Sequence, residues 1–443
     1  MADTRQNDLA VSTTPRAGAA AIQVVIGLDF GTSSTKVVVR RRGENRAEVI
    51  APTWPAPSHP WFVTPSVVRV KGGRLSFGTE ALTSLGGVLL RSLKVKLLDT
   101  RVTTIRIGTE EVSVDLLVTI FLIRVLGDVR ARLDERHGTG GYRVYLNLAA
   151  PMSHLEDRTL KERYLRIAGA VYESVFGAET LRVGEDSLLA ELRSRFSRAF
   201  SPDAVVPDQS IRRYDVLPET IAPLVSLLHD PATDPGMYAV VDVGAGTTEM
   251  SISCLKVESN GRRTISCYHD ETQQLGGDDF DRADSQAPDL HEATAKELVT
   301  RFRKQFNRTW ESGRRKDAAL PWHVEQWGET TVILTGGGAH RAPIDQHLNL
   351  TNRSDGPWRQ MCSGSRRFKY AVRWHRPSSS ALEFPLAPDA SNDERSEIHL
   401  LAVAHGLSFH RQEWPIVYPP ESVEVQEGRE QIERPEPGWY QSE

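Results

Sequence analysis

Two stretches of this chain combine an aspartate with a tight turn of small, hydroxylated residues, which are the residue types that bind phosphate. The first runs from Ile26 to Lys36 around Asp29, and the second from Val240 to Glu249 around Asp242. Each reads as an apolar strand that ends in Asp-x-Gly, a short turn, and a second apolar strand. Small residues let several backbone N–H groups converge, and the hydroxyls add donors for phosphate oxygens.

The two aspartates predict a cation. A carboxylate beside phosphates is repelled unless a cation lies between them, so Asp29 and Asp242 indicate Mg²⁺, held through water because this ion dehydrates reluctantly. Neither stretch is a Walker loop, since no G-x-x-x-x-G-K-[ST] occurs and each turn runs into a strand. One such turn is typical of an ordinary β-hairpin. Two in one chain favour two similar domains that face each other across one nucleotide.

The composition is that of an ordinary globular protein. The 443 residues suffice for two or three domains, and 25% are charged and 39% hydrophobic. A formal net charge of −4 gives no indication of nucleic-acid binding. The three cysteines, Cys254, Cys267 and Cys362, form no CxxC pair, which favours a reducing compartment without structural zinc. The longest apolar run, 116–126, is too short for a bilayer, and no secretory signal is evident, so we expect a cytoplasmic protein without membrane contact.

Signals for strands and for helices both occur along the chain, and we expect a fold of the α/β class. Turn signals and the periodicity of apolar residues set the expected bounds. Besides the strands that flank the two turns, we expect strands over 142–149 and 330–334, and helices over 80–98, 113–135, 155–176, 181–200, 218–228, 290–310 and 398–407.

Five segments, in order, carry a resemblance to a known superfamily. The chain resembles the ATPases of the actin, heat-shock chaperone and sugar-kinase superfamily, and most of all the nucleotide-binding domain of the heat shock protein seventy (DnaK-type) family. The resemblance covers roughly 23–412, with gaps. The Leu-Gly-Gly-Asp-Asp-Phe-Asp run is the most specific for the chaperone branch, whereas the two turns identify only the superfamily. The segments are the turn at Asp29; 64–68 with 77–78 and 92–94; 217–220; the turn at Asp242; and 275–281, after which 335–339 matches the adenosine-binding glycines.

The resemblance implies two ribonuclease-H-like lobes with ATP or ADP and Mg²⁺ in the cleft between them. The implied lobe I covers 23–235, with an insertion at about 177–211, and lobe II covers 236–396. A final helix at 397–411 returns to lobe I. Outside them we expect a disordered N-terminus over 1–22 and an acidic, Pro-rich tail over 412–443.

The resemblance also implies roles for individual residues. The catalytic residues would be Asp29, Lys94, Glu219 and Asp242. The metal shell would be formed by Asp29, Asp242 and Glu249. The nucleotide would contact Gly31, Thr32, Ser33, Lys36, Gly244, Gly246, Thr247, Thr248, Gly336, Gly337, Gly338 and His340.

Simpler alternatives stand beside several of these roles. Lys94 could be a solvated helix lysine, and Glu219 a residue stabilised in the first turn of a helix by the dipole. Glu185 competes with Glu219, which we favour because a short helix links it directly to the second turn. Lys36 is typical of actins and many sugar kinases rather than chaperones, and equally of an edge-strand lysine. The residue that stacks on adenine stays unassigned.

The resemblance implies a nucleotide switch in which ATP closes the two lobes and a water hydrolyses it slowly. Glu249 departs from the chaperone pattern, which has Asp there: the carboxylate is kept but reaches further into the implied metal shell. A peptide-binding β-sandwich needs on the order of 100 residues, more than follow residue 412, so we expect no peptide-binding domain. The alternatives are an actin-like filament-forming ATPase and a small-molecule kinase. The output would pass through an unknown protein partner or self-association.

Overall fold

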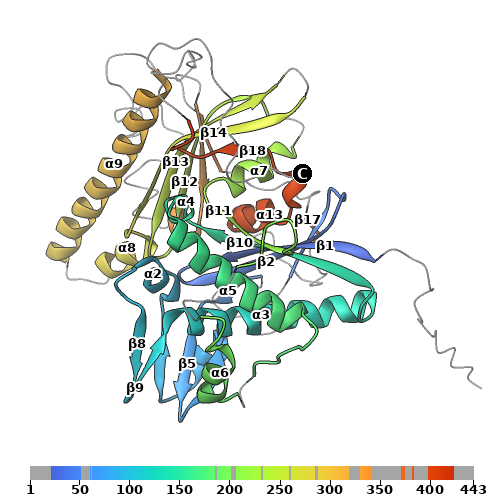
Figure 1. Ribbon diagram of the computed structural model, residues 1–443. Coiled ribbons are helices and arrows are strands. Elements are labelled where there is room, and N and C mark those ends of the chain that lie inside the picture. Colours follow the sequence, from blue (N-terminus) through green and yellow to red (C-terminus); the bar gives the residue numbers. More distant parts are fainter. Residues whose placement is uncertain are drawn as a thin grey trace, which may run out of the picture.

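The structure, a computed structural model, shows a mixed α/β protein in which helices flank two large sheets (Figure 1). Most of the predicted N-terminal segment 1–22 and the predicted tail beyond residue 423 lie outside the described residues. None of the helices that the structure describes has the length and apolarity needed to cross a bilayer. The described residues are 21–50, 60, 62–184, 187–200, 206–230, 233–258, 261–284, 288–318, 330–340, 371–374, 382–383 and 398–423.

The first sheet carries the first turn at the end of β1. This strand is antiparallel to β2 and parallel to β10. Alternate residues of β1, Val24, Ile26 and Leu28, are fully buried in a core beneath the long helices α3 and α5. The strand order is β11-β10-β1-β2-β3-β17, with β4 beside β2, and the bounds are β1 (Ile22–Phe30), β2 (Ser34–Arg41), β3 (Ala47–Val49), β4 (Thr64–Pro65), β10 (Tyr142–Ala150), β11 (Tyr214–Pro218), β17 (Leu382–Glu383), α3 (Val114–His137) and α5 (Arg158–Phe176).

Smaller elements surround this sheet. The predicted helix over 80–98 is divided by a strand, because Gly86 and Gly87 adopt φ angles of 76° and 73° that a helix cannot contain. The predicted helix over 181–200 is present only as the shorter α6. The bounds are β5 (Val68–Lys71), β6 (Arg74–Phe77), α1 (Gly78–Thr83), β7 (Val88–Leu90), α2 (Leu93–Leu98), β8 (Thr104–Ile107), β9 (Glu110–Ser113), α4 (Met152–Glu156) and α6 (Leu189–Phe196).

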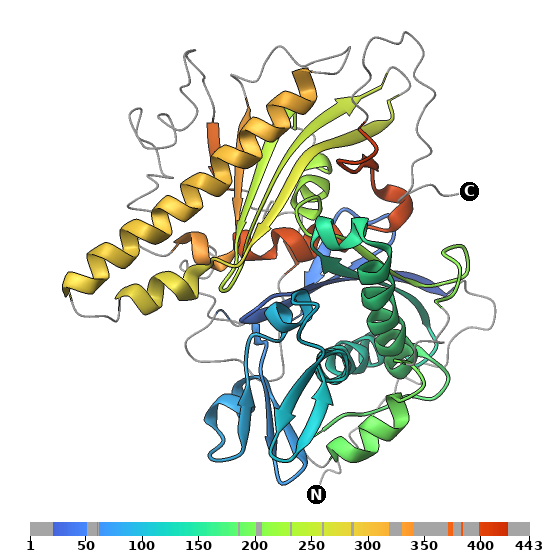
Figure 2. The same ribbon diagram turned by 60° about the vertical axis from the view of Figure 1, so that its left-hand side comes forward.

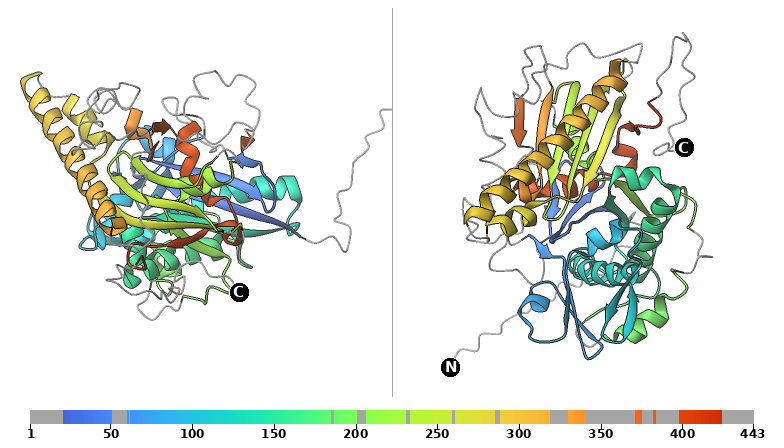
Figure 3. Two further views of the ribbon diagram at one scale, coloured as in Figure 1. Left: turned by 90° about the horizontal axis from the view of Figure 1, so that it is seen from above. Right: turned by 90° about the vertical axis from the view of Figure 1, so that its left-hand side faces the viewer.

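The second sheet repeats the strand pattern of the first. In both sheets, the first three strands in spatial order are parallel to one another, and the third begins an antiparallel three-strand meander. The order β11-β10-β1-β2-β3 thus corresponds to β16-β15-β12-β13-β14. Helix α9 runs obliquely across the outer face of this sheet (Figure 3). The bounds are β12 (Gly236–Val243), β13 (Thr248–Val257), β14 (Arg263–Gln273), α8 (Gly277–Asp284), α9 (Pro288–Ala318), β15 (Thr331–Thr335), η2 (Gly337–His340), β16 (Ala371–Trp374) and β18 (Ile416–Tyr418).

Two short helices fill the space between the sheets (Figure 2). Helix α7 (Ala222–Leu228) and helix α13 (Ala402–Leu407), which follows η3 (Ile398–Leu401), share one apolar core with residues of both sheets. They cross so closely that a methyl group on Gly406 would lie 1.8 Å from the carbonyl oxygen of Ala222. Helix α13 also covers Gly27 of β1, the strand that ends in the first turn.

Gly406→Ala is therefore expected to lower the free energy of unfolding by about 1–3 kcal/mol, because the methyl group meets backbone that cannot move aside. Gly127→Ala in α3 is the matched control, since nothing lies within 4 Å of the added methyl group. That change is expected to stabilise by up to about 1 kcal/mol through helix propensity alone. Urea unfolding followed by circular dichroism measures both, and equal effects would contradict the close crossing.

The described residues continue beyond the predicted tail boundary at 412. After η4 (Arg411–Glu413), β18 adds a parallel strand beside β14. Trp414, Val417 and Val423 are buried in the cores of the second sheet. The Pro-rich composition of this stretch therefore does not prevent its first part from packing.

Candidate functional site

The same main-chain hydrogen bond closes the two predicted turns. In the first, the Gly31 N–H donates to the carbonyl oxygen of Ser34 at 3.1 Å. In the second, the Gly244 N–H donates to that of Thr247 at 2.8 Å. A side chain on Gly31 would lie 2.5 Å from the Ser34 oxygen, so this turn requires glycine. The resemblance between the two stretches therefore extends to their backbone.

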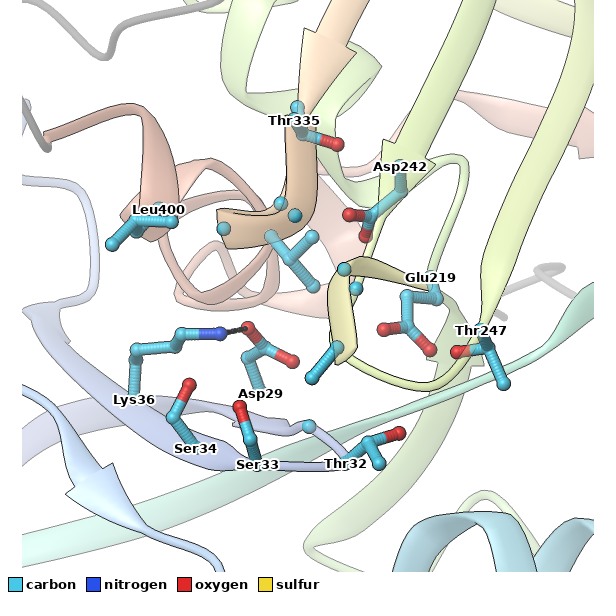
Figure 4. A pocket seen from close by; sticks show the side chains of 18 of the residues that line it. Asp29, Thr32, Ser33, Ser34, Lys36, Glu219, Asp242, Thr247, Thr335 and Leu400 are labelled. Carbon is cyan, nitrogen blue, oxygen red and sulfur yellow. Dashed lines mark hydrogen bonds and ion pairs between the residues drawn. The ribbon is translucent and has the colours of Figure 1, made fainter. Parts of the chain in front are cut away.

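The two turns meet at one cavity. Gly246 of the second turn packs on the first, where a methyl group on it would lie 2.9 Å from Cγ2 of Thr32. Beside this contact is a cavity of about 390 Å³, lined from both sheets (Figure 4). The predicted site residues that line it are Asp29, Gly31, Thr32, Ser33, Lys36, Lys94, Glu219, Asp242, Gly244, Thr247, Glu249, Gly336, Gly337 and Gly338.

Each hairpin places a charged residue directly opposite its aspartate, but the two charges have opposite signs. Lys36 lies opposite Asp29, and its Nζ donates to Asp29 Oδ2 at 3.0 Å. Glu249 occupies the corresponding position opposite Asp242. Lys36 is only 8% exposed and β2 lies inside the sheet, so the geometry does not fit an edge-strand lysine.

Lys94 interacts with carboxylates from both sheets, Glu219 of the first and Glu249 of the second. Lys94 is buried in the first turn of α2. This helix begins directly after Ser92, whose φ of 54° is rare for serine. The Nζ of Lys94 donates to both carboxylate oxygens of Glu219, at 2.6 Å to Oε1, and lies 3.8 Å from Glu249 Oε1. Burial disfavours the ammonium, but attraction to Glu219, Glu249 and Asp29 outweighs it and raises the pKa of Lys94. A solvated helix lysine does not describe this residue.

Glu219 follows β11 directly and does not lie in the first turn of a helix. Its N–H donates to the carbonyl oxygen of Ala150 at 2.9 Å, which extends the pairing of β11 with β10. Helix α7 begins only at Ala222, so the predicted helix over 218–228 starts too early. The strand end, rather than a helix dipole, therefore positions this carboxylate at the cavity.

Two carboxyl groups from the second hairpin are strongly perturbed. Burial, with repulsion from Glu219 and Asp29, raises the pKa of Asp242 to about 7, although Lys94 and Lys36 act in the opposite direction. Burial and Glu219 also raise the pKa of Glu249 well above its usual range. Neither carboxylate oxygen of Glu249 accepts a hydrogen bond from the part of the chain that the structure describes. Both groups would ionise more readily beside an additional cation.

The donor set suits a hydrated divalent cation rather than a directly ligated one. Among the described residues, no three or more His, Cys, Asp or Glu side chains lie close enough to bind a metal ion together. The cavity is nevertheless lined by four carboxylates and two ammonium groups, which leaves two negative charges in excess when all are ionised. Mg²⁺ keeps most of its water ligands in such sites. The predicted water-mediated Mg²⁺ therefore fits the residues present.

Two glycine-rich segments pack against the second turn. Gly336 has a φ of +83°, and a methyl group on it would lie 2.2 Å from Asp242 Oδ1. A methyl group on Gly338 would lie 2.5 Å from the carbonyl oxygen of Gly244. The N–H of Gly277, in the Leu-Gly-Gly run, donates to that same oxygen at 2.9 Å. A methyl group on Gly276 of the same run would lie 2.2 Å from the carbonyl oxygen of Ala245, so both segments need glycine where their backbones pass the turn.

Two predicted nucleotide contacts, Gly246 and Thr248, do not line the cavity, and a third, His340, has a side chain outside the described residues. The Thr248 hydroxyl donates to the carbonyl oxygen of Leu275 at 2.6 Å and so ties the second hairpin to the Leu-Gly-Gly run. Gly246 brings the two turns together, as described above. His340 is the last residue of η2.

The residues at or near the cavity that the sequence analysis did not name as site residues include Thr335 and Tyr164. Thr335 lines the cavity opposite Asp242, and its buried hydroxyl has no hydrogen-bond partner among the described residues. Its place directly before Gly336 in the glycine motif could have identified it. Tyr164 in α5 is buried close enough to Lys94 to interact with its charge, and its hydroxyl likewise has no described partner. No local motif marks Tyr164, because only the packing of α5 brings it there.

In comparisons with known proteins, no protein-family model matches the chain, and no curated protein matches it.

Proposed function

We propose that this chain binds Mg·ATP between two ribonuclease-H-like lobes and hydrolyses it slowly, as a nucleotide switch of the actin, heat-shock chaperone and sugar-kinase superfamily. One observation carries the proposal. Two turns with the same closing hydrogen bond, each on a sheet with the same five-strand pattern, face one cavity. A ligand with a chain of phosphates is the ligand that two such turns would hold together.

The turns supply phosphate donors from both sides. The hydroxyls of Thr32 and Ser33 line the cavity from the first sheet, and that of Thr247 from the second (Figure 4). Backbone N–H groups of such turns add donors that suit phosphate oxygens. Gly337 and Gly338 line the same cavity without side chains, which leaves space for a ribose and base.

The charges explain the requirement for Mg²⁺. Asp29 and Asp242 would hold the hydrated ion from the two sides, and Glu249 would add a third carboxylate. When bound, Mg²⁺ would neutralise charge on the phosphates and on these carboxylates. Because Asp242 has a pKa raised to about 7 by burial and neighbouring carboxylates, its loss of a proton would accompany binding.

Hydrolysis would depend on a competition for Lys94. In the structure its ammonium is held by Glu219. A terminal phosphate would attract the same ammonium, which could then offset charge that develops during transfer. Glu219, released from Lys94, would be free to orient the attacking water. Since the two sheets each supply part of the phosphate site, ATP would bridge them better than ADP and favour closure.

A matched pair of substitutions tests the nucleotide site. Thr247→Val removes a hydroxyl that lines the cavity and is expected to weaken Mg·ATP binding by about tenfold, the contribution of a hydrogen bond to a charged group. Thr248→Val removes the adjacent hydroxyl, which donates to Leu275, so its affinity is expected to stay close to that of the wild type. Isothermal titration calorimetry measures both.

Wild-type protein that shows no affinity for Mg·ATP in the micromolar range or better would overturn the proposal. Equal losses in the two variants would contradict the assignment of Thr247. Light scattering on the same samples separates a switch from a filament, because a rise on addition of Mg·ATP is expected only of a polymer.

A further inference from the structure

A second cavity, of about 510 Å³, lies on the face of the first sheet beside the chain that leaves α13. It shares no lining residue with the nucleotide cavity. Its walls come from β10, from the edge strand β11 with the residues that precede it, from the residue that follows β2, and from η4 with the residue before it. It therefore calls for an explanation independent of ATP.

Arginines dominate this cavity. Four of them line it, Arg42, Arg212, Arg213 and Arg411, against two carboxylates. One carboxylate, Asp215, is shared: it accepts from Arg212 Nη2 at 3.0 Å and lies 3.7 Å from Arg411 Nη1. The cavity therefore has an excess of positive charge.

The other charged groups do not remove this excess. Asp208 accepts from the backbone N–H and hydroxyl of Ser210, at 2.9 and 2.7 Å. Arg42 donates to two neutral amide oxygens, those of Gln23, at 2.6 Å, and Gln412. These hydrogen bonds fix the position of the Arg42 guanidinium group but do not pair its charge with a negative group.

One arginine nitrogen is left without an acceptor. The side chain of Arg212 is only 8% exposed, and its buried Nε has no hydrogen-bond partner among the described residues. A buried donor without an acceptor is costly, and a bound ligand is one of the usual remedies. A ligand oxygen in the cavity that Arg212 lines would supply the missing acceptor.

An aromatic pair completes the wall. The rings of Tyr145 and His410 are perpendicular, with centroids 4.6 Å apart. Burial, and then repulsion from Arg42 and Arg411, lowers the pKa of His410 to about 4, so this ring is neutral near pH 7. The arginines, rather than the histidine, provide the charge.

We propose that this second cavity binds a small, multiply charged oxyanion, a molecule that carries phosphate or several carboxylates. Guanidinium groups form paired, charge-assisted hydrogen bonds with both kinds of group. The site does not depend on the proposed ATPase activity. The second cavity is nevertheless linked to α13 through Asn147, one of its lining residues. Asn147 donates to the carbonyl oxygens of Leu407 and Phe409, at the end of α13, at 2.7 and 3.0 Å.

Calorimetric titrations with pyrophosphate and, separately, with citrate test the proposal. Arg411→Gln and Arg42→Gln are each expected to weaken binding by roughly tenfold, because each removes a charged donor. Arg193→Gln is the matched control: this arginine lies on α6, 57% of its side chain is exposed, and it does not line the cavity. Binding by the control is expected to equal that of the wild type.

Two variants keep the test informative if one of them folds poorly, and a thermal melt of each shows whether it has folded. Pyrophosphate binding that weakens in the arginine variants would assign the site to phosphorylated ligands, and citrate binding that weakens in them to polycarboxylates; either supports the proposal, whereas citrate binding that is unchanged in both variants, without pyrophosphate binding that weakens in them, overturns it. Absence of binding by the wild type up to about 10 mM of both anions would overturn it. Pyrophosphate binding that persists unchanged in both arginine variants, with no response to citrate, would place the anion elsewhere and also overturn it.

Discussion

Lys94→Met is expected to lower the free energy of unfolding by about 3–5 kcal/mol even in the absence of nucleotide. Removal of one member of a buried ion pair leaves the other charge without a partner, and this cost is large. The ammonium is buried, donates to both oxygens of Glu219 and lies 3.8 Å from Glu249. The methionine fills a similar volume, so the loss reports the charge rather than a void.

A second substitution isolates the cause. Lys94→Met combined with Glu219→Gln removes both charges, and we expect it to recover a large part of the lost stability, as neutral replacements of buried pairs do. Lys96→Met on the same helix is the control, since Lys96 is only half-buried and its ammonium donates to the carbonyl oxygen of Arg91 rather than to a buried carboxylate. Urea unfolding of the four proteins gives the comparison.

The same variants separate stability from catalysis. ATP hydrolysis is expected to be lost in both Lys94 variants, including the restabilised one, because each lacks the ammonium that would offset charge on the phosphates. If Lys94→Met behaved like Lys96→Met in both assays, Lys94 would be an ordinary helix lysine. If the double variant recovered hydrolysis together with stability, the lysine would have only a structural role.

The sequence identified the parts of the site that depend on local geometry. The turns at Asp29 and Asp242 could be predicted because a tight strand-to-strand turn requires small residues at fixed spacing from the strand end. Gly336 could be predicted for a similar reason, since backbone passes too close for a side chain. The α/β class, expected together with the family resemblance, agrees with the sheets and flanking helices.

Partners distant in the sequence could not be predicted by the same means. Lys94 and Glu219 are 125 residues apart, and only the tertiary fold brings the start of α2 and the end of β11 within reach of this ion pair. Thr248 appeared equivalent to Thr247, but successive residues of a strand point to opposite faces, so its hydroxyl meets Leu275 instead of the cavity. The second cavity collects arginines from three separate segments, none of which forms a motif.

The opposite charges of the two hairpins give the cavity its polarity. On the first strand pair, Lys36 neutralises Asp29. On the second, Glu249 adds to the charge of Asp242. The internal repeat is therefore symmetric in backbone and asymmetric in charge, and the excess negative charge lies on the side of the second sheet. We expect this asymmetry to affect stability and Mg·ATP binding most strongly through Asp242.

Asp242→Asn is expected to stabilise the protein without nucleotide while it impairs the proposed function. Burial and the neighbouring carboxylates raise the pKa of Asp242 from 3.8 to about 7. A carboxyl with a raised pKa stabilises the fold fully below about pH 4, and this contribution is lost as the pH rises through about 7. Asparagine keeps the shape without the charge, so we expect a gain of about 1–3 kcal/mol at pH 8 that shrinks as the pH falls toward 4.

The effect on Mg·ATP should have the opposite sign. A carboxylate that acts on Mg²⁺ through its water ligands typically contributes about 10- to 100-fold in affinity or activity, so Asp242→Asn should bind and hydrolyse Mg·ATP more weakly by that factor.

In the wild type, affinity should increase as the pH rises from 6 to 8, because binding favours the ionised carboxylate, and this dependence should weaken in the variant. Asp128→Asn on α3, away from the cavity, controls for the loss of one partly buried carboxylate, here paired with Arg124. Unfolding and calorimetry at pH 5, 6, 7 and 8 test both signs together. A variant that is less stable than the wild type at pH 8, or that binds Mg·ATP equally well, would show that Asp242 is not the strained, cation-dependent carboxylate that its surroundings indicate.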